Sequence, residues 1–122
     1  MTIRETFEAL VDSVTVDRDA AVFANLWVAD DPSITMWGSD LDEAAEGSDA
    51  VRRMGEAIAG AEHDLCFHWR EIATHERGEV AWVNASGHIT AGGEEHPYRV
   101  TAVFLRSYAG WRCHTFSGSI PN

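Results

Sequence analysis

The sequence predicts a single α+β domain, residues 1–122, in which three N-terminal helices pack on one face of a curved antiparallel sheet. In the first half of the chain, apolar residues recur at spacings of three and four, which is the period of an amphipathic helix. From about residue 63, four stretches rich in β-branched and aromatic residues follow, separated by turn signals. Helices followed by a run of strands are typical of this fold class.

The first two helices are marked by capping and breaking residues. Thr2 and Glu5 form a capping-box pattern at the start of a helix expected over residues 2–14. Asp17 is expected to cap a second helix. That helix should end before Pro32, because proline disfavours helical backbone at the residue that precedes it.

The middle of the chain alternates between strand, loop and helix signals. Residues 33–39 are β-branched and aromatic and predict a short strand. Residues 40–47 form an acidic stretch that predicts a loop. Ser48 or Asp49 is expected to cap a third helix over roughly 49–60.

The second half predicts a meander of strands whose side chains alternate between two faces. In residues 79–90, the small apolar set should face the core, and the set with Trp82, Asn84 and His88 should face water or a partner subunit. Turns with the sequences ERGE, AGGEEHP and SYAG separate the strands. The four expected strands are 63–75, 79–90, 97–107 and 111–119.

The turn SYAG decides which faces of the last two strands point inward. A three-residue loop that closes at Gly110 pairs Thr101 with Ser117 and Leu105 with Cys113. A two-residue loop reverses the pattern, so that Thr101 meets Phe116 instead. The residues alone leave both arrangements open.

Composition excludes several kinds of partner. The formal net charge is −11, and all nine basic residues are arginine. Such an acidic chain repels phosphate backbones, so no nucleic-acid partner is expected. The charged N-terminus is unlike a signal peptide, and no apolar run has the length of a membrane span, so a cytoplasmic protein without a membrane partner is expected. Cys66 and Cys113 should then be reduced and buried.

The sequence contains no motif that indicates a cofactor. The chain has no nucleophile elbow, phosphate loop or dinucleotide fingerprint. Its six histidines include no His-x-His pair, and Cys-x-x-Cys does not occur. We therefore expect neither a cofactor nor a metal site. An acidic run beside Trp37 is expected to be a solvated loop, or else to present one carboxylate to a pocket.

Three stretches resemble the SnoaL-like group of the nuclear transport factor 2-like superfamily, which also holds ketosteroid isomerases and the association domain of calmodulin-dependent kinases. These stretches are DPSITMWGSDLDEAAEGSDAVRRM (31–54), GEVAWVNASG (78–87) and RVTAVFLRSYAGWRCHTFSGSIP (99–121). The resemblance covers nearly the whole chain. It implies a cone-shaped, cystatin-like fold with a strongly curved, mainly antiparallel sheet, an apolar pocket between sheet and helices, and a homodimer formed through the convex sheet face.

The resemblance also favours the three-residue loop, which turns Arg99 and Trp111 inward. Members of the group often carry two histidines in the last strand, where this chain has Thr115 and Ser117. In the catalytic role, Asp40 of the acidic loop would be the base and Arg99 would stabilise negative charge. The expected ligand-binding residues are Trp37, Arg99, Thr101, Trp111, Thr115 and Ser117.

Two functions from different classes follow. The first is a protein that binds a small, partly apolar organic molecule and performs an isomerase-, cyclase- or dehydratase-type acid–base step. The second is a non-catalytic module for ligand binding or oligomerisation, which the absence of the isomerases' tyrosine from the first helices favours. A domain whose cavity is filled by its own side chains is a third possibility, and the volume of the cavity distinguishes it from the other two.

Overall fold

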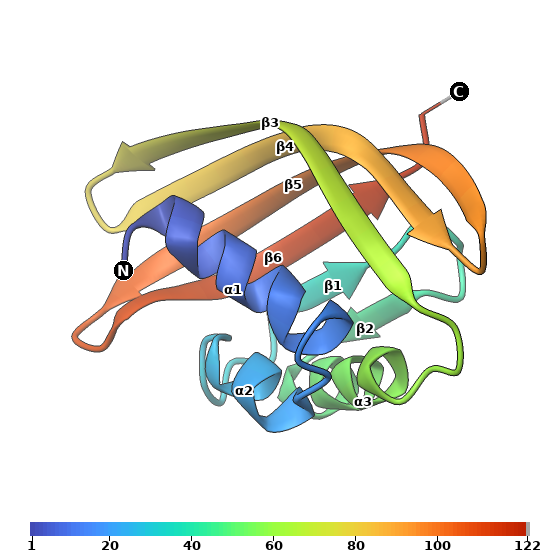
Figure 1. Cartoon of the computed structure of the whole chain (residues 1–122). Coiled ribbons are helices and arrows are strands. Elements are labelled where there is room, and N and C mark those ends of the chain that lie inside the picture. The colour runs from blue at the N-terminus through green and yellow to red at the C-terminus, as the bar shows by residue number, and fades with distance from the viewer. Residues whose placement is uncertain (122) are drawn as a thin grey trace.

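The protein folds as three helices against one strongly curved sheet (Figure 1). The computed structural model describes residues 1–121. The helices are α1 (Ile3–Thr15), α2 (Ala20–Asn25) and α3 (Ser48–Ala59). The strands are β1 (Thr35–Trp37), β2 (Ala44–Glu46), β3 (Leu65–Arg77), β4 (Val80–Ala91), β5 (Glu94–Ser107) and β6 (Gly110–Ser119). This is the α+β architecture that the sequence predicts.

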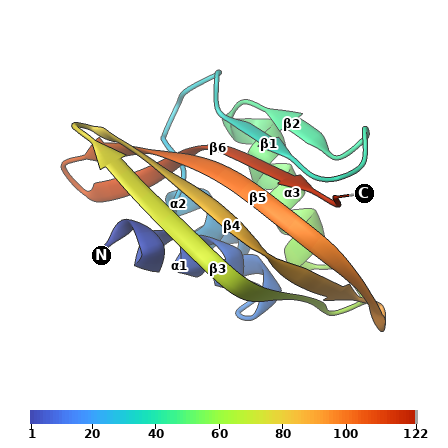
Figure 2. The ribbon, with the colours of Figure 1, turned by 90° about the horizontal axis from the view of Figure 1, so that it is seen from above.

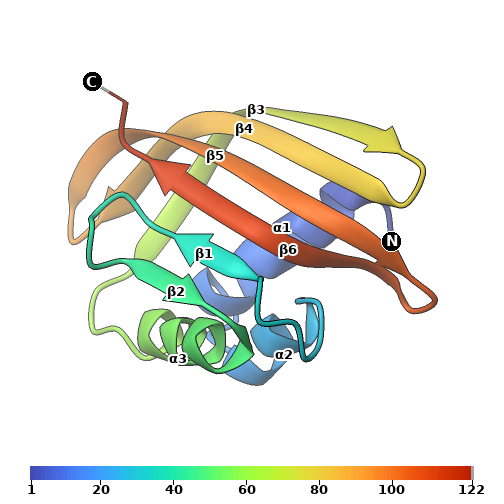
Figure 3. The same ribbon diagram turned by 180° about the vertical axis from the view of Figure 1, so that it is seen from behind.

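The sheet is mixed and has the strand order β2-β1-β6-β5-β4-β3. All neighbours are antiparallel except β1 and β6, which run parallel. The long strands arch over α1, as the view from above shows (Figure 2). From behind, β1 and β2 extend the sheet beyond β6, and α3 lies beneath them (Figure 3). No helix of the described chain is long and apolar enough to cross a membrane.

The N-cap of α1 is the residue that the sequence predicts, whereas the N-cap of α2 is a different one. At α1, the Thr2 hydroxyl accepts a hydrogen bond from the Glu5 N–H (3.1 Å), and the Glu5 carboxylate accepts one from the Thr2 N–H (2.9 Å). The predicted cap Asp17 is wrong, because Asp19 caps α2 by accepting from two backbone N–H groups at 3.1 and 3.2 Å. Arg18, with a φ of 53°, interrupts helical backbone just before that cap.

The start of α3 also differs from prediction. Neither Ser48 nor Asp49 caps the helix, since α3 begins one residue earlier and its N-cap is Gly47 with a φ of 85°. Glycine has no side chain that could accept from the helix, and no side-chain cap forms. Part of the predicted acidic loop is strand β2, which pairs with β1.

The core lies between α1 and the inner face of the sheet. Phe7 and Leu10 of α1 are fully buried, as are Ala81 and Val83 of β4. The alternation of β4 therefore matches the prediction, with its small apolar residues inward. The prediction that both cysteines are buried is wrong for Cys66, which alternates to the exposed face of β3. Cys113 is buried, and both are free thiols.

A two-residue turn and a β-bulge overturn the faces that were predicted for β5 and for the second half of β6. The β5–β6 turn has two residues, since Ser107 pairs with Gly110. The extra residue at the bulge, His114, shifts the register, so that Thr101 still pairs with Ser117, but on the outer face of the sheet. The other predicted pair is wrong, because Leu105 pairs with Arg112. The inward residues of these two strands are Tyr98, Val100, Ala102, Phe104, Trp111, Cys113, Phe116 and Gly118.

Candidate functional site

A cavity of about 640 Å³ opens between the helices and the inner face of the sheet. This volume lies within the range of small-molecule sites. Most of the wall is apolar and comes from every layer of the fold: Leu10, Val11 and Val14 of α1, Phe23 of α2, Met36 of β1, Met54 and Ile58 of α3, Leu65 and Phe67 of β3 and Phe116 of β6. The polar part of the wall includes Asp42, Glu43, Arg53 and Tyr98.

Glu43 is held at the cavity by the turn between β1 and β2. Gly38 donates its N–H to the Glu43 carbonyl (2.7 Å), and the Glu43 N–H donates to the Asp40 carbonyl (3.0 Å). The Glu43 carboxylate accepts from the Asp40 N–H at 3.1 Å. It folds back over Gly38, where a Cβ would lie 2.8 Å from its Oε2 atom. Only glycine leaves room for this conformation.

Partial burial raises the pKa of the Glu43 carboxyl, although the residue as a whole is exposed at the rim. The nearby Asp40 and Asp42 charges contribute in the same direction, while the Asp40 N–H opposes them. A raised pKa makes the ionised carboxylate a stronger base.

Tyr98 lies in the inner wall of the cavity and is 7% exposed. The edge of its ring meets Phe67, with centroids 5.5 Å apart. Its hydroxyl end lies over Gly118, where a Cβ would come within 2.0 Å of the Tyr98 oxygen. Burial raises the pKa of Tyr98 to about 12, and the charges of Glu43 and Asp40 add to the shift. The phenol therefore stays protonated near neutral pH and can donate a hydrogen bond.

Most of the residues predicted for the site lie elsewhere. Trp37 does line the cavity, about half exposed. Asp40 is exposed and outside the cavity wall, so its expected place is taken by Asp42 and Glu43. Arg99 and Thr101 are exposed on the outer face of β5, because the two-residue turn pairs the inward Trp111 with Arg106 and not with Ser107.

The three remaining predicted residues belong to β6. Thr115 and Ser117 lie beyond the bulge on the outer face, so they do not reach the cavity. Trp111 points inward, as predicted, but it is 7% exposed and covered by Arg106, whose guanidinium lies 4.4 Å from the centre of its ring. It contributes to the core at the far end of the sheet and not to the cavity wall.

The chain matches one known domain family over nearly its whole length. The SnoaL-like domain matches residues 3–122. The chain belongs to the SnoaL-like domain family. No curated protein matches it.

Solved structures share the fold of this SnoaL-like chain at low identity. A candidate dehydratase of the nuclear transport factor 2-like family from Streptomyces avermitilis is 18% identical, with a TM-score of 0.87 over 98% of this chain and 94% of its own. A candidate calcium/calmodulin-dependent protein kinase type II association domain from Thiobacillus denitrificans is also 18% identical, with a TM-score of 0.79 over 99% and 96%. A candidate ketosteroid isomerase from Parabacteroides distasonis is 15% identical, with a TM-score of 0.70 over 99% and 89%.

The sequence analysis missed Arg53 and Tyr98 of the SnoaL-like cavity, and from the acidic run it chose Asp40 instead of Glu43 as the base. A signal for Tyr98 was present, since Val100, Ala102 and Phe104 share its face and are more apolar than the alternative set. For Glu43 and Arg53 no comparable signal existed, because each is one of several charged residues in its segment.

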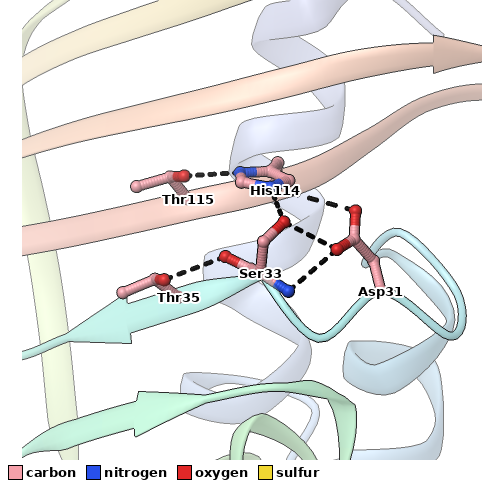
Figure 4. A network of polar contacts seen from close by, with 5 residues as sticks. All are labelled: Asp31, Ser33, Thr35, His114 and Thr115. Atoms are coloured by element: carbon pink, nitrogen blue, oxygen red, sulfur yellow. Dashed lines mark hydrogen bonds and ion pairs between the residues drawn. The ribbon is translucent and has the colours of Figure 1, made fainter.

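The SnoaL-like chain carries a second polar cluster outside the cavity (Figure 4). The Ser33 hydroxyl donates to Asp31 Oδ1 (2.6 Å) and lies 2.8 Å from His114 Nε2. Since its one proton goes to the carboxylate, Ser33 accepts from the imidazole N–H. His114 Nδ1 contacts the Thr115 hydroxyl at 2.7 Å.

This cluster contains a hydroxyl, an imidazole and a carboxylate, yet its geometry is not that of a catalytic triad. In a triad the carboxylate binds the ring nitrogen opposite the one that faces the nucleophile. Here Asp31 and Ser33 both lie at Nε2, at 3.9 and 2.8 Å. The cluster instead ties the bulge in β6 to the segment before β1. His114 is absent from the cavity wall.

The described part of this SnoaL-like chain has no group of side chains that could hold a metal ion. Within residues 1–121, no group of three or more His, Cys, Asp or Glu side chains is placed to hold an ion. The polar groups of the cavity wall include two carboxylates, one guanidinium, one phenol and the Thr15 hydroxyl, which suit proton transfer and hydrogen bonding.

Proposed function

We propose that the cavity binds a small, partly apolar organic molecule and that Glu43 and Tyr98 perform an acid–base step of the isomerase, cyclase or dehydratase type. One observation carries this proposal. A carboxylate with a raised pKa and a tyrosine with a pKa of about 12 share the wall of one largely apolar cavity. Titratable groups with shifted pKa values in a cleft are typical of catalytic sites.

The two groups suit proton removal next to a carbonyl. Glu43 takes a proton from the carbon beside the carbonyl, and Tyr98 donates a hydrogen bond to the oxygen on which negative charge develops. Returning the proton from Glu43 to a different carbon completes an isomerisation. Alternatively, the β-hydroxyl leaves as water with the proton that Glu43 has taken, which completes a dehydration and restores the Glu43 carboxylate. The apolar wall around the buried Tyr98 strengthens its hydrogen bond to the developing charge.

Two of the similar structures support this class of reaction. One is a candidate dehydratase and another a candidate ketosteroid isomerase, and both share the fold of this chain. Their identities of 18% and 15% are too low to transfer a substrate. The proposal therefore rests on the cavity residues of this chain.

Exchange of carbon-bound hydrogen tests the proposal without a known substrate. The protein is incubated in D₂O with a panel of small cyclic ketones, and loss of the proton signal beside the carbonyl is followed by NMR. We expect the protein to accelerate exchange of at least one ketone. Glu43→Gln should abolish the acceleration, and Tyr98→Phe should reduce it by roughly 10²-fold, the typical effect of losing one such donor. Arg99→Gln, on the outer face, is the matched control and should have no effect.

The non-catalytic alternative is favoured by the outer face of the sheet, which we propose is covered by a second copy of the chain. Aromatic and imidazole rings stack there, His75 on Trp82 at 5.4 Å and His68 on His88 at 4.7 Å. Tryptophan is enriched at protein interfaces. A Trp82→Glu variant should lower the mass measured in solution from that of a dimer to that of a monomer. A wild-type monomer would contradict this proposal.

A further inference from the structure

A second cavity, of about 560 Å³, shares no wall residue with the first. It lies between the segment that follows α2, the start of α3 and the β5–β6 hairpin. Its size again suits a small organic molecule. Three features give this cavity a chemistry different from that of the first.

The first feature is a pair of buried polar atoms without partners. Trp27 Nε1 and Ser48 Oγ are both buried and, within residues 1–121, form no hydrogen bond. Both residues line the second cavity, and Trp27 is only 4% exposed. Buried polar atoms are nearly always paired, and an indole N–H can only donate. The missing partner of the Trp27 N–H is therefore a hydrogen-bond acceptor.

The second feature is the start of α3. Ser48 is the first residue of this 12-residue helix, whose N-cap Gly47 has no side chain to accept from the first N–H groups. Uncapped N–H groups and the helix dipole favour a negative charge at this end of the helix. Asp49 lies in the first turn, but it accepts no capping hydrogen bond.

The third feature is a group of three arginines in the wall of this cavity, in a very acidic protein. Three arginines and two aspartates, Asp30 and Asp49, line the cavity, whereas the whole chain carries −11. Arg52 pairs with Glu56, and Arg106 pairs with Glu76 at 2.9 Å.

The third arginine, Arg112, is half-buried and differs from the other two. It has no ion-pair partner in the described part of the chain and donates only to the Trp111 carbonyl, at 2.9 Å. Most of its five N–H donors thus remain free.

We propose that this second cavity binds the carboxylate or phosphate group of a small organic anion. Arg112 supplies the charge, and Trp27 Nε1 and Ser48 Oγ donate hydrogen bonds to the anion at the start of α3. Arginine favours such planar, multidentate recognition of oxyanions. The proposal is independent of the chemistry assigned to the first cavity, because the two cavities have no residue in common.

NMR titration with benzoate and with phenyl phosphate tests the proposal. The Trp27 indole resonance is assigned by its loss in Trp27→Phe. We expect a saturable shift of this resonance with at least one probe, in the millimolar range or below. A response to benzoate alone would assign a carboxylate ligand, and a response to phenyl phosphate alone a phosphate ligand. No saturable shift with either probe would overturn the proposal.

Two variants locate the binding. Arg112→Gln and Ser48→Ala should each weaken the effective probe about tenfold, the effect expected for a hydrogen bond to a charged group. Arg77→Gln removes the same charge from the exposed end of β3 and should leave affinity unchanged. Equal losses in Arg112→Gln and Arg77→Gln would show general charge attraction and overturn the proposal.

A stability measurement separates binding from structure at Ser48. Because its hydroxyl has no partner, Ser48→Ala should melt at the same temperature as wild type, or higher, when no anion is present. The increase in Tm that wild type shows with the effective probe should shrink in the variant. A variant that melts lower without anion would contradict the unpaired hydroxyl on which the proposal depends.

Discussion

Replacing Gly118 with alanine would test how Tyr98 is held in the cavity wall. An added Cβ would lie 2.0 Å from the Tyr98 oxygen, 2.6 Å from Cζ and 2.8 Å from Cε2. Ordinary contact begins near 3.4 Å, so the end of the ring would have to move by about 1.4 Å. The ring cannot move freely, because it is 7% exposed and its edge packs on Phe67.

The structure sets the size of this effect. Overpacking a well-packed site costs about 1–3 kcal/mol. At a position that tolerates alanine, the same change stabilises a protein by about 0.4–1 kcal/mol, because the unfolded chain loses freedom. We therefore expect Gly118→Ala to lower the stability of the wild type by roughly 1–2 kcal/mol, or the Tm by roughly 4–8 °C. Leucine at position 98 lacks the three clashing atoms, so in Tyr98→Leu the alanine should be neutral or stabilising.

Urea unfolding of the four proteins in this double-mutant cycle measures the coupling directly. The predicted result is a cost for Gly118→Ala in wild type that disappears or changes sign in Tyr98→Leu. An equal cost in both backgrounds would refute the reasoning, because it would show that alanine clashes with something other than the Tyr98 ring.

Three further predictions concern backbone packing and pH. Gly87→Ala should destabilise the protein by about 3 kcal/mol in urea unfolding, because a Cβ would meet the His68 carbonyl at 2.0 Å. The Ser33 hydrogen bonds lower the pKa of Asp31 in the folded protein. The ionised Asp31 therefore stabilises the fold above the pKa that it has in the unfolded chain, and this stabilisation is lost as pH falls through the pKa of the folded protein. Asp31→Asn should therefore melt lower than wild type at pH 7, with a gap that closes in acid. Burial raises the pKa of Glu43 in the folded protein, so wild type loses stability as pH rises past the pKa that Glu43 has in the unfolded chain. Glu43→Gln should therefore melt at a higher temperature than wild type at pH 7. This difference in Tm should also close in acid.

Periodicity and capping chemistry allowed the order of the elements to be predicted. The capping box of α1 and the alternation in β4 follow from local sequence, and both match the structure. The faces of β5 and of the second half of β6 do not follow in the same way. The residues left the length of the β5–β6 turn open, and this length sets the faces of β5. One extra residue, His114, interrupts the alternation of β6, and a pattern of period two contains no sign of where such a bulge falls.

The candidate site was predictable only in outline. The sequence placed a carboxylate of the acidic loop at the pocket, but the backbone of the turn decides which one. The turn folds Glu43 over Gly38 and leaves Asp40 exposed. The second cavity is formed by three segments distant in sequence, including Trp27 and Arg112, so no local pattern could reveal it.

The central claim is that ligands bind in the inner cavity against Tyr98, and calorimetric titration with 2-naphthol tests it most directly. This flat aromatic alcohol resembles an enol, and its apolar rings suit the cavity wall. We predict saturable binding that Tyr98→Phe weakens about tenfold, as for loss of one strong hydrogen bond, and that Arg99→Gln leaves unchanged. Binding that depends on Arg99 and is indifferent to Tyr98 would contradict the account, because Arg99 lies on the outer face of the sheet.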